Sequence, residues 1–394
     1  MLPDGWKSYC LGNVFKLTSG KSRPKKYLSP KAIGNEIPVF GGNGITGYTS
    51  DFLIENQTIV IGRVGEYCGC VRLSPGQAWI TDNALYICEI YLEQDLLFLS
   101  YLLKFANLEK LRNETGQPLI SQKPIYDLVL AFPPLHEQKK IAAILSSVDE
   151  AITSTQAVID QTHKVKQGLL QQLLTRGIGH TKFKESAIGK IPELWKLKRI
   201  NELGEVQAGR QRSPHFTEGK IRPYLRVANV FDGYIDTSDV LEMAFTEDEY
   251  KRYCLRDGDI LLNEGQSLDL VGRSAIYRGV PKNCCFQNTL IRFRAYKDIN
   301  IEFAQTLFQF LQYSGRFSAI ALQTTSIAHL GVSRFASLEV MLPPYEEQCQ
   351  IAEIFSVQQK ALNTEREKLL QLQILKRGLM QDFLTGKVRV GCTS

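Results

Sequence analysis

The stretch PPLHEQKKIAAILSSVDEAI, residues 133–152, returns 210 residues later as PPYEEQCQIAEIFSVQQKAL, residues 343–362, with nine of twenty positions identical. The same offset aligns 166–175 with 376–385, where six of ten positions match. An internal repeat has to be recognised first, because it determines how the whole chain is divided. These matches predict that the chain is built from two related copies.

A weaker match lies at the front of each copy. Residues 2–20 align with 191–209 at an offset of 189, so the second copy carries 21 extra residues between its two matching segments. A chain of 394 residues is long enough for two or three domains of ordinary size. We therefore predict two copies that match in sequence at their first and last segments and differ between them.

Each strongly matching segment is predicted to begin a long helix. A Pro-Pro pair precedes each segment, no proline follows for about 40 residues, and Gly177 and Gly386 suit the helix ends. Seven of ten positions at alternating steps of four and three are apolar in each copy; in the first they are 141, 145, 148, 152, 155, 159, 162, 166, 169 and 173. We predict two helices of ~60 Å that pair as an antiparallel coiled coil. Two unrelated core helices are the alternative.

The segments between the helices are predicted to be α/β modules. Short β-type runs at 58–61, 85–87, 259–262 and 290–293 alternate with glycine turns, and 94–107 and 302–314 are amphipathic. The predicted division is a first module at 1–132, a helix at 133–177, a linker at 178–190, a second module at 191–342, a helix at 343–386 and a tail at 387–394. The expected fold class is α/β (α+β), with a pseudo-twofold internal repeat.

The composition excludes several classes of protein. With 44% hydrophobic and 22% charged residues the chain is globular. The longest apolar stretch, Leu96–Leu103, is far shorter than the ~20 residues of a membrane span. The N-terminus lacks the apolar core of a signal peptide, so we expect a cytoplasmic protein without a membrane partner. The nine cysteines include no C-x-x-C pair and are expected to be reduced.

No set of residues predicts a catalytic site. Gly42-x-Gly44-x-x-Gly47 matches the dinucleotide fingerprint, but no helix is expected after it. Leu342-Pro-Pro-Tyr345 is similar to the tetrad of amino-methyltransferases, but leucine cannot accept a hydrogen bond where Asn or Asp must. A P-loop and an H-E-x-x-H motif are missing, and the five histidines lack ligand spacing. We predict a chain that is not an enzyme and that holds neither metal nor cofactor.

Basic residues gather at the same place in both copies. Seven basic and no acidic residues lie between Gly5 and Asn35, and five basic residues with only Glu218 lie between Gln207 and Asn229. Lys and Arg neutralise phosphates, and amide or guanidinium groups can read base edges. A solvated surface and ordinary turn positions are the alternatives. The predicted DNA-binding residues are Lys21, Arg23, Lys25, Lys26, Asn43, Arg63, Arg210, Arg212, Arg226, Asn229, Asn263, Gln266 and Arg273.

Several of these segments resemble the specificity subunit of type I restriction–modification systems, and the resemblance covers essentially the whole chain. It implies a DNA-binding subunit in which two target recognition domains are joined by two long helices. The segments are P-P-L-x-E-Q-x-x-I-A at 133–142 with its copy at 343–352, W-K-x-x-x-L-x-x-V from Trp6, G-x-x-G-Y-T-x-D at 44–51, T-D-N-A-L-Y-I at 81–87 and G-x-I-L-L-N at 258–263.

The resemblance also implies partners. Methyltransferase subunits would carry S-adenosylmethionine, restriction and motor subunits would use ATP and magnesium, and this chain would bind double-stranded DNA. Because the two interiors differ, we expect a split and asymmetric site, with the helices setting its spacer. The repeated polar pairs Glu137-Gln138 and Glu347-Gln348 are expected either to contact methyltransferase subunits or to cap the helices. The rival functions are an intact methyltransferase, a coiled-coil scaffold without a DNA role, and the specificity part of another restriction–modification class.

Overall fold

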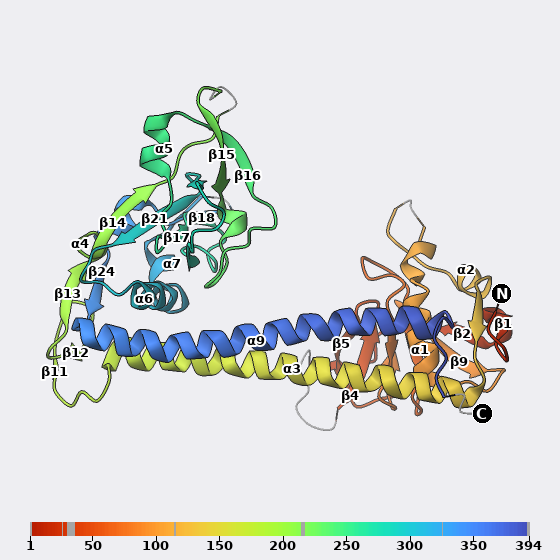
Figure 1. The fold of residues 1–394 in the computed structure, drawn as a ribbon. Coiled ribbons are helices and arrows are strands. Elements are labelled where there is room, and N and C mark those ends of the chain that lie inside the picture. Colours follow the sequence, from red (N-terminus) through yellow and green to blue (C-terminus); the bar gives the residue numbers. More distant parts are fainter. Residues whose placement is uncertain are drawn as a thin grey trace. The chain divides into compact units, whose positions relative to one another are not determined.

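The computed structural model describes residues 2–25, 27–29, 36–113, 116–213, 217–324 and 326–391. The chain divides into two compact units, one formed by residues 1–156 with 367–394 and the other by residues 157–366. Each unit holds one module together with the first part of one long helix and the last part of the other. The element labels follow Figure 1.

The two predicted long helices are present. Helix α3 (Leu135–Arg176) has 42 residues and helix α9 (Tyr345–Leu384) has 40. Both begin directly after a Pro-Pro pair, and the glycines that follow them, Gly177 and Gly386, have φ angles of +67° and +71°. These left-handed conformations are the ones that end helices at glycine. Every stripe position predicted from the heptad pattern is buried or half-buried in both helices.

The helices pair antiparallel, as predicted. In the first unit, Lys376 Nζ lies 2.6 Å from Asp149 Oδ1, which joins the late part of α9 to the early part of α3. In the second unit, Lys166 Nζ donates to Gln359 Oε1 at 2.8 Å, which joins the late part of α3 to the early part of α9. Lys166 and Lys376 are repeat equivalents, so the same position crosses to the partner helix in each copy.

The first module consists of two four-stranded sheets and short helices. One sheet is antiparallel with strand order β2-β9-β6-β7; the other has the order β3-β5-β4-β8, with β4 and β8 parallel. Strand β1 pairs with β10 beside the start of α3. The bounds are β1 Lys7–Cys10, η1 Leu11–Asn13, β2 Phe15–Ser19, β3 Tyr27–Ser29, β4 Ile37–Gly41, β5 Gly44–Thr49, β6 Ile59–Gly62, β7 Val71–Leu73, β8 Trp79–Ile80, β9 Ala84–Ile90, α1 Leu96–Phe105, η2 Leu108–Leu111, α2 Gln122–Tyr126 and β10 Val129–Phe132.

The second module repeats the antiparallel sheet and the parallel strand pair on a different sequence, but its second sheet has three strands and it has a further sheet of order β18-β23-β22. Its antiparallel sheet has the order β14-β21-β17-β19, its second sheet is β16-β15-β20 with β15 and β20 parallel, and β13 pairs with β24. The bounds are β13 Lys196–Arg199, α4 Ile200–Leu203, β14 Gly204–Ala208, β15 Lys220–Leu225, η3 Val227–Asn229, β16 Leu241–Phe245, α5 Glu247–Tyr253, β17 Ile260–Asn263, β18 Gly265–Gln266, β19 Ser274–Ile276, β20 Cys285–Phe286, β21 Leu290–Ala295, α6 Ile301–Tyr313, α7 Arg316–Ile320, β22 Leu322–Gln323, β23 Ala328–His329, α8 Val332–Ser337 and β24 Glu339–Leu342.

The predicted β-type runs and amphipathic segments are present in the structure. The four β-type runs lie in β6, β9, β17 and β21, and the two amphipathic segments form α1 and α6. In the linker, Phe183–Lys184 form strand β11, which pairs with β12 (Ile191–Pro192) at the start of the second module. Gly42 to Gly47 form the β4–β5 hairpin, so the interpretation as a glycine turn is confirmed. The eight described cysteines are free thiols.

Each unit has its own apolar core, and both long helices contribute to it. In the first unit, Ile141 and Leu145 of α3 and Phe383 of α9 are buried with the sheet and α1. In the second, Leu170 of α3 and Ile351 of α9 are buried with the sheet and α6. Burial of this kind fixes the helix ends to the modules. Among the described residues, no helix combines the length and the apolar character that a membrane crossing requires.

Candidate nucleic-acid interface

The same backbone hydrogen bonds organise one end of each module. Arg63 N donates to Asn83 O at 2.9 Å, and Ile120 N donates to Arg63 O at 2.9 Å. In the second module, Glu264 N donates to Thr289 O at 2.9 Å, and Leu330 N donates to Glu264 O at 2.8 Å. Arg63 and Glu264 are therefore equivalent positions, each directly after a central strand, β6 or β17.

Further backbone bonds bring other turns to this end. Lys21 N donates to Ile80 O at 3.0 Å, and Arg210 N donates to Phe286 O at 3.0 Å, which makes Lys21 and Arg210 equivalent. The hairpin turn packs closely, because a Cβ on Gly42 would lie 2.6 Å from Val64 O. We call these turns the loop end of each module. It comprises residues 19–23, 41–44, 63–66, 81–83 and 116–120 in the first module and 208–212, 226–229, 264–267, 287–289 and 327–331 in the second.

In the first module the predicted residues reach the surface of the loop end. Lys21, Arg23 and Lys25 are exposed, and Asn43 is exposed in the β4–β5 turn. Arg63 is half-buried, and its Nη1 donates to Ser19 Oγ at 3.0 Å. Lys26 lies outside the described residues. The loop end of the first module thus contains four of the six predicted residues, and Lys25 is exposed two positions beyond it.

Sequence reasoning missed Arg72 in the same region. Arg72 Nη2 donates to the backbone carbonyl of Asn43 at 3.3 Å, so a strand residue 29 positions away adds a cation to the turn. None of the predicted β runs covers β7, so no signal in the sequence set Arg72 apart from the other basic residues. Strand pairing, which the sequence does not state, is what brings the two together.

In the second module Arg210 requires a correction. Its side chain is buried, its Nε lies 2.8 Å from Glu249 Oε1, and its Nη1 donates to Ala244 O at 2.6 Å. The guanidinium also lies 4.9 Å from the ring centre of Phe245. These contacts occupy the guanidinium inside the module, which contradicts the prediction that Arg210 contacts DNA.

Asn229 and Asn263 are also internal, contrary to the prediction. Asn229 is buried, donates to Asp236 O and Asp239 O at 3.0 and 2.9 Å, and accepts from Arg226 N at 3.0 Å. Asn263 is fully buried and donates to Val230 O at 3.3 Å. The Asn229 amide is occupied by partners inside the module, whereas the buried Oδ1 of Asn263 has no hydrogen-bond partner among the described residues.

The remaining predicted residues of the second module are accessible to different degrees. Arg212 is exposed and Gln266 is half-buried at the loop end. Arg226 is half-buried and forms an ion pair with Asp239. Arg273 is half-buried, with its guanidinium 5.1 Å from the ring centre of Phe231. Arg212 and Gln266 are therefore the members of the predicted set best placed for DNA in this module.

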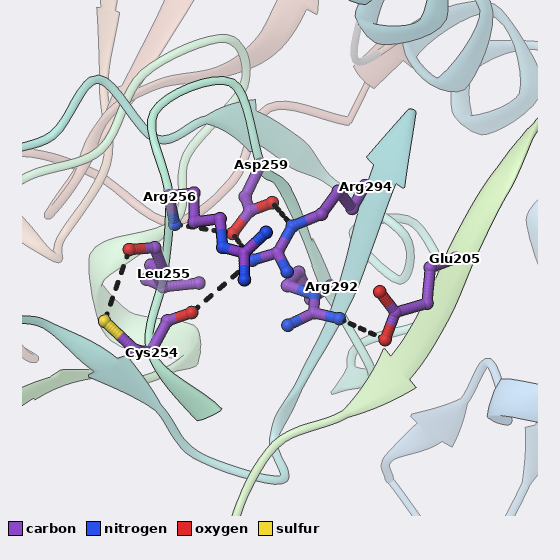
Figure 2. A network of polar contacts seen from close by, with 7 residues as sticks. All are labelled: Glu205, Cys254, Leu255, Arg256, Asp259, Arg292 and Arg294. Atoms are coloured by element: carbon purple, nitrogen blue, oxygen red, sulfur yellow. Dashed lines mark hydrogen bonds and ion pairs between the residues drawn. The ribbon is translucent and has the colours of Figure 1, made fainter. Parts of the chain in front are cut away.

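Two further arginines show how this module uses cations internally (Figure 2). Arg294 on β21 donates to both carboxylate oxygens of Asp259 at 2.7 Å, and Asp259 is almost fully buried. Arg292, two residues earlier on the same strand, donates to Glu205 at 2.6 Å and is itself buried. A buried charge has to be paired, so these arginines hold strands together and do not add to a surface for DNA.

The repeated glutamates at the helix starts are buried as well. Glu137 accepts from Trp6 Nε1 at 3.3 Å and from Arg389 Nε and Nη2 at 2.8 and 2.9 Å. Glu347 accepts from Trp195 Nε1 and Ile178 N at 2.9 Å and lies 2.9 Å from His180 Nε2. Burial alone would raise the pKa of Glu137, but its hydrogen bonds with Arg389 and Val390 N outweigh burial and hold that pKa below its ordinary value.

The repeated glutamines connect the helix starts to the modules. Gln138 Oε1 accepts from Asp95 N, and Gln348 Oε1 accepts from Asn300 N, each at 3.0 Å. Asp95 and Asn300 are the N-caps of α1 and α6. Since Glu137, Gln138, Glu347 and Gln348 are all buried with internal partners, the structure does not support their prediction as contacts for methyltransferase subunits. They anchor α3 and α9 to the modules.

The described residues offer no candidate metal site, and the exposed side chains of the loop ends are cationic or polar. Within these residues, His, Cys, Asp and Glu side chains form no group of three or more that could hold a metal ion. The exposed cations of the first module and the polar side chains of the second are suited to phosphate oxygens and base edges. The first module therefore presents cations at its loop end, and the second module presents mainly polar side chains at the equivalent end.

The class of the protein follows from comparison with known families. The chain belongs to the type I restriction modification DNA specificity domain family, whose model matches residues 3–162 and again residues 192–373. The resemblance noted in the sequence is thereby confirmed, and the family match falls twice on the two copies of the repeat.

Individual relatives agree with this assignment. The chain is 29% identical to the type I restriction enzyme MjaVIII specificity subunit of Methanocaldococcus jannaschii, over 99% of this chain and 94% of the relative. It is 24% identical to the type I restriction enzyme EcoKI specificity subunit of Escherichia coli K12, over 89% and 81% of the two chains. Both relatives are therefore matched over most of their length.

Solved structures share the fold. The S subunit of a type I restriction–modification system from M. genitalium superposes with a TM-score of 0.62 at 18% identity, over 96% of both chains. A chain from a study of complex assembly and conformational transition of the type I R-M system gives 0.56 at 16% identity, over 98% of this chain and all of that one. At these identities the likeness concerns the fold.

Proposed function

We propose that this chain is the sequence-specificity subunit of a type I restriction–modification complex, in which each module binds one half of a split DNA site. The observation that carries the proposal is the loop end, where one hydrogen-bond frame recurs in both modules with different side chains. A repeated frame suits repeated contact with one kind of polymer, and different side chains suit different sequences. The double match to a DNA specificity family supports the same interpretation.

The proposal includes a division of labour with other subunits. The chain itself would be non-catalytic, methyltransferase subunits would carry S-adenosylmethionine, and restriction subunits would use ATP and magnesium. Several relatives are named as specificity subunits of type I restriction enzymes, which supports this division. The loop ends present donors and acceptors but no nucleophile paired with a base, in the part of the chain described above.

The two long helices are proposed to set the number of base pairs between the half-sites. They are uninterrupted over 42 and 40 residues, and each is anchored by its first turn to a module through Glu137 or Glu347. A rigid element of fixed length suits a fixed spacer. Methyltransferase docking would then use exposed surface of the chain, because the buried Glu-Gln pairs are occupied.

The decisive test is the methylated motif in cells. Genomic DNA from cells with and without this gene, both carrying the partner subunits, would be compared by sequencing that detects methylated bases. We expect one split, asymmetric motif that disappears with the gene, because unlike modules read unlike half-sites. A palindromic motif would contradict two different modules, and an unchanged methylome would contradict the proposed function. A scaffold without a DNA role predicts the unchanged result.

A further inference from the structure

The equivalent positions Arg63 and Glu264 carry opposite charges. The backbone N–H of each residue donates to the turn before the neighbouring strand, β9 or β21. The backbone carbonyl of each residue accepts from the loop that precedes α2 or α8. A third pair of bonds agrees, since Gly62 N donates to Cys70 O and Asn263 N donates to Arg273 O, each at 2.9 Å. Three equivalent backbone hydrogen bonds therefore surround Arg63 and Glu264, and the two positions differ in their side chains.

Arg63 is held so that its guanidinium lies at the loop end. Its Nη1 donates to Ser19 Oγ at the end of β2. Ser19 Oγ is in turn within 3.4 Å of the Asp82 carbonyl. A guanidinium has five N–H donors in a planar fork, and the bond to Ser19 uses one of them. The equivalent of Ser19 in the second module is Ala208, which offers no hydroxyl.

Glu264 is held from a different strand. His329 Nδ1 lies 3.0 Å from Glu264 Oε2, and because an ionised carboxylate only accepts, Nδ1 is the donor. Strand pairing of Gly265 with His329 sets this geometry, and a Cβ on Gly265 would come within 3.3 Å of the imidazole. The Glu264 side chain keeps 20% of its surface exposed, so the carboxylate can accept from a ligand as well. Leu119 occupies the place of His329 in the first module.

We propose that this position reads one base in each half-site, with Arg63 specifying guanine and Glu264, oriented by His329, specifying a base with an exocyclic amino group, chiefly cytosine. The inference rests on the proposed function. In the major groove guanine offers two acceptors, O6 and N7, which match the guanidinium fork, whereas cytosine offers the N4 amino donor, which matches a carboxylate. Because the backbone frame is the same and the side chains carry opposite charges, the first module selects a base that accepts hydrogen bonds and the second a base that donates one.

The test replaces each residue by glutamine and determines the methylated motif in cells that carry the partner subunits. R63Q should relax the guanine at one position of the first half-site by about tenfold or more, because a bidentate contact discriminates on this scale. E264Q should move one position of the second half-site from cytosine toward adenine, since an amide pairs with adenine N6 and N7. In each variant the other half-site should stay unchanged.

Matched controls are R377Q and E242Q, which remove the same charges from exposed positions on α9 and β16. Both should keep the original motif. H329L should relax the same position as E264Q with a smaller effect, because the carboxylate loses its orientation. A motif identical to the wild-type motif in R63Q and E264Q would overturn the proposed readout while leaving the proposed function intact.

Loss of all methylation has to be separated from misfolding. R63K and E264D keep the charge and are expected to retain the base preference at reduced efficiency. Suppose that these two variants methylate normally and that the glutamine variants keep the wild-type Tm. If the glutamine variants then lose base preference at positions throughout both half-sites, the position acts through the backbone frame, and the inference is wrong. If even the wild-type complex gives no motif, the proposed function itself fails.

Discussion

The same tryptophan–glutamate contact anchors the start of the long helix in both copies. Trp6 meets Glu137 and Trp195 meets Glu347, but the third partner is Arg389 in one copy and His180 in the other. In both cases it comes from the segment that follows a long helix. The tail after α9 therefore does for the first module what the linker after α3 does for the second.

Replacing Glu137 by glutamine should destabilise the protein in a pH-dependent way. The folded state lowers the pKa of Glu137 from its ordinary 4.5, so its stabilisation is fully present above pH 4.5 and disappears as the pH falls through the lowered value. We expect E137Q to lower the free energy of unfolding by about 1–3 kcal/mol at pH 7, since a buried charged hydrogen bond is lost. Urea denaturation at pH 7 and pH 3.5 would measure this difference, which should shrink at the lower pH.

The exposed Glu150 on the same helix provides the control. E150Q should change the free energy of unfolding by less than about 0.5 kcal/mol at both pH values. A difference for E137Q that stays constant between the two pH values would show that folding does not lower the pKa of Glu137.

The sequence predicts the type of residue at the loop end better than its orientation. Lys21 and Arg210 are equivalent cations with the same backbone bond, yet Lys21 is exposed and Arg210 is buried. Glu249 on α5 and Phe245 on β16 make the difference, and both lie more than 30 residues away from Arg210. No local pattern announces such partners, so a basic run alone cannot separate a surface arginine from a structural one.

At the scale of elements, the helices were the easiest part to predict. Their heptad stripes run through 40 residues, and the Pro-Pro pairs and glycines mark the ends, so α3 and α9 match the predicted bounds within two residues. The strand order of the modules could not be predicted, because pairs such as β2 with β9 join residues about 70 positions apart. A short apolar run indicates a strand but not its neighbour.

Shortening both helices by one heptad should shorten the spacer of the recognised site. Deleting Ile152–Val158 together with Leu362–Lys368 keeps the apolar stripe in phase and removes ~10 Å of helix. That length corresponds to roughly three base pairs at ~3.4 Å each. The methylated motif of this variant should keep both half-sites and lose about three bases between them.

Two observations decide that experiment. The variant must first show an unchanged cooperative unfolding transition, which establishes that the deletion is tolerated. A folded variant that methylates the original spacing would show that something other than the helix length sets the spacer. Deleting only one of the two heptads is the matched control. Each helix then keeps its own stripe, but the two helices differ in length by ~10 Å, so their ends no longer match the two modules and the protein should be destabilised.

At the scale of the whole molecule, described residues near the two ends of the chain lie side by side in the first unit (Figure 1). Arg389 Nη1 donates to the backbone carbonyl of Asp4 at 2.8 Å, and a Cβ on Gly386 would lie 2.5 Å from Pro3. The repeat predicts this contact, because the tail stands where the linker stands in the other copy. The predicted neighbourhood of the two ends is confirmed for residues 3–6 and 386–391.

A circular permutant should therefore fold and keep its specificity. The original ends would be joined by a short flexible linker, and the chain would be opened between Ser186 and Ala187, in an exposed turn that lies beyond the His180 contact to Glu347. Exposed polar turns tolerate such cuts. The methylated motif in cells should equal that of the parent protein.

The cut site can be tested against its own control. Opening the chain between Gly177 and Ile178 separates Ile178 N and His180 from α3 and should lower the Tm, because Glu347 loses a covalently tethered partner. If the Ser186–Ala187 permutant were insoluble or recognised another motif, the tail and the linker would not be equivalent.

The frame around Arg63 and Glu264 has a consequence for how such chains diverge. Its bonds come from main-chain groups, which every residue except proline supplies in the same form. A mutation at either position therefore changes the side chain presented without altering the support that holds it. Single mutations can therefore introduce new side chains at these two positions with little loss of folding stability.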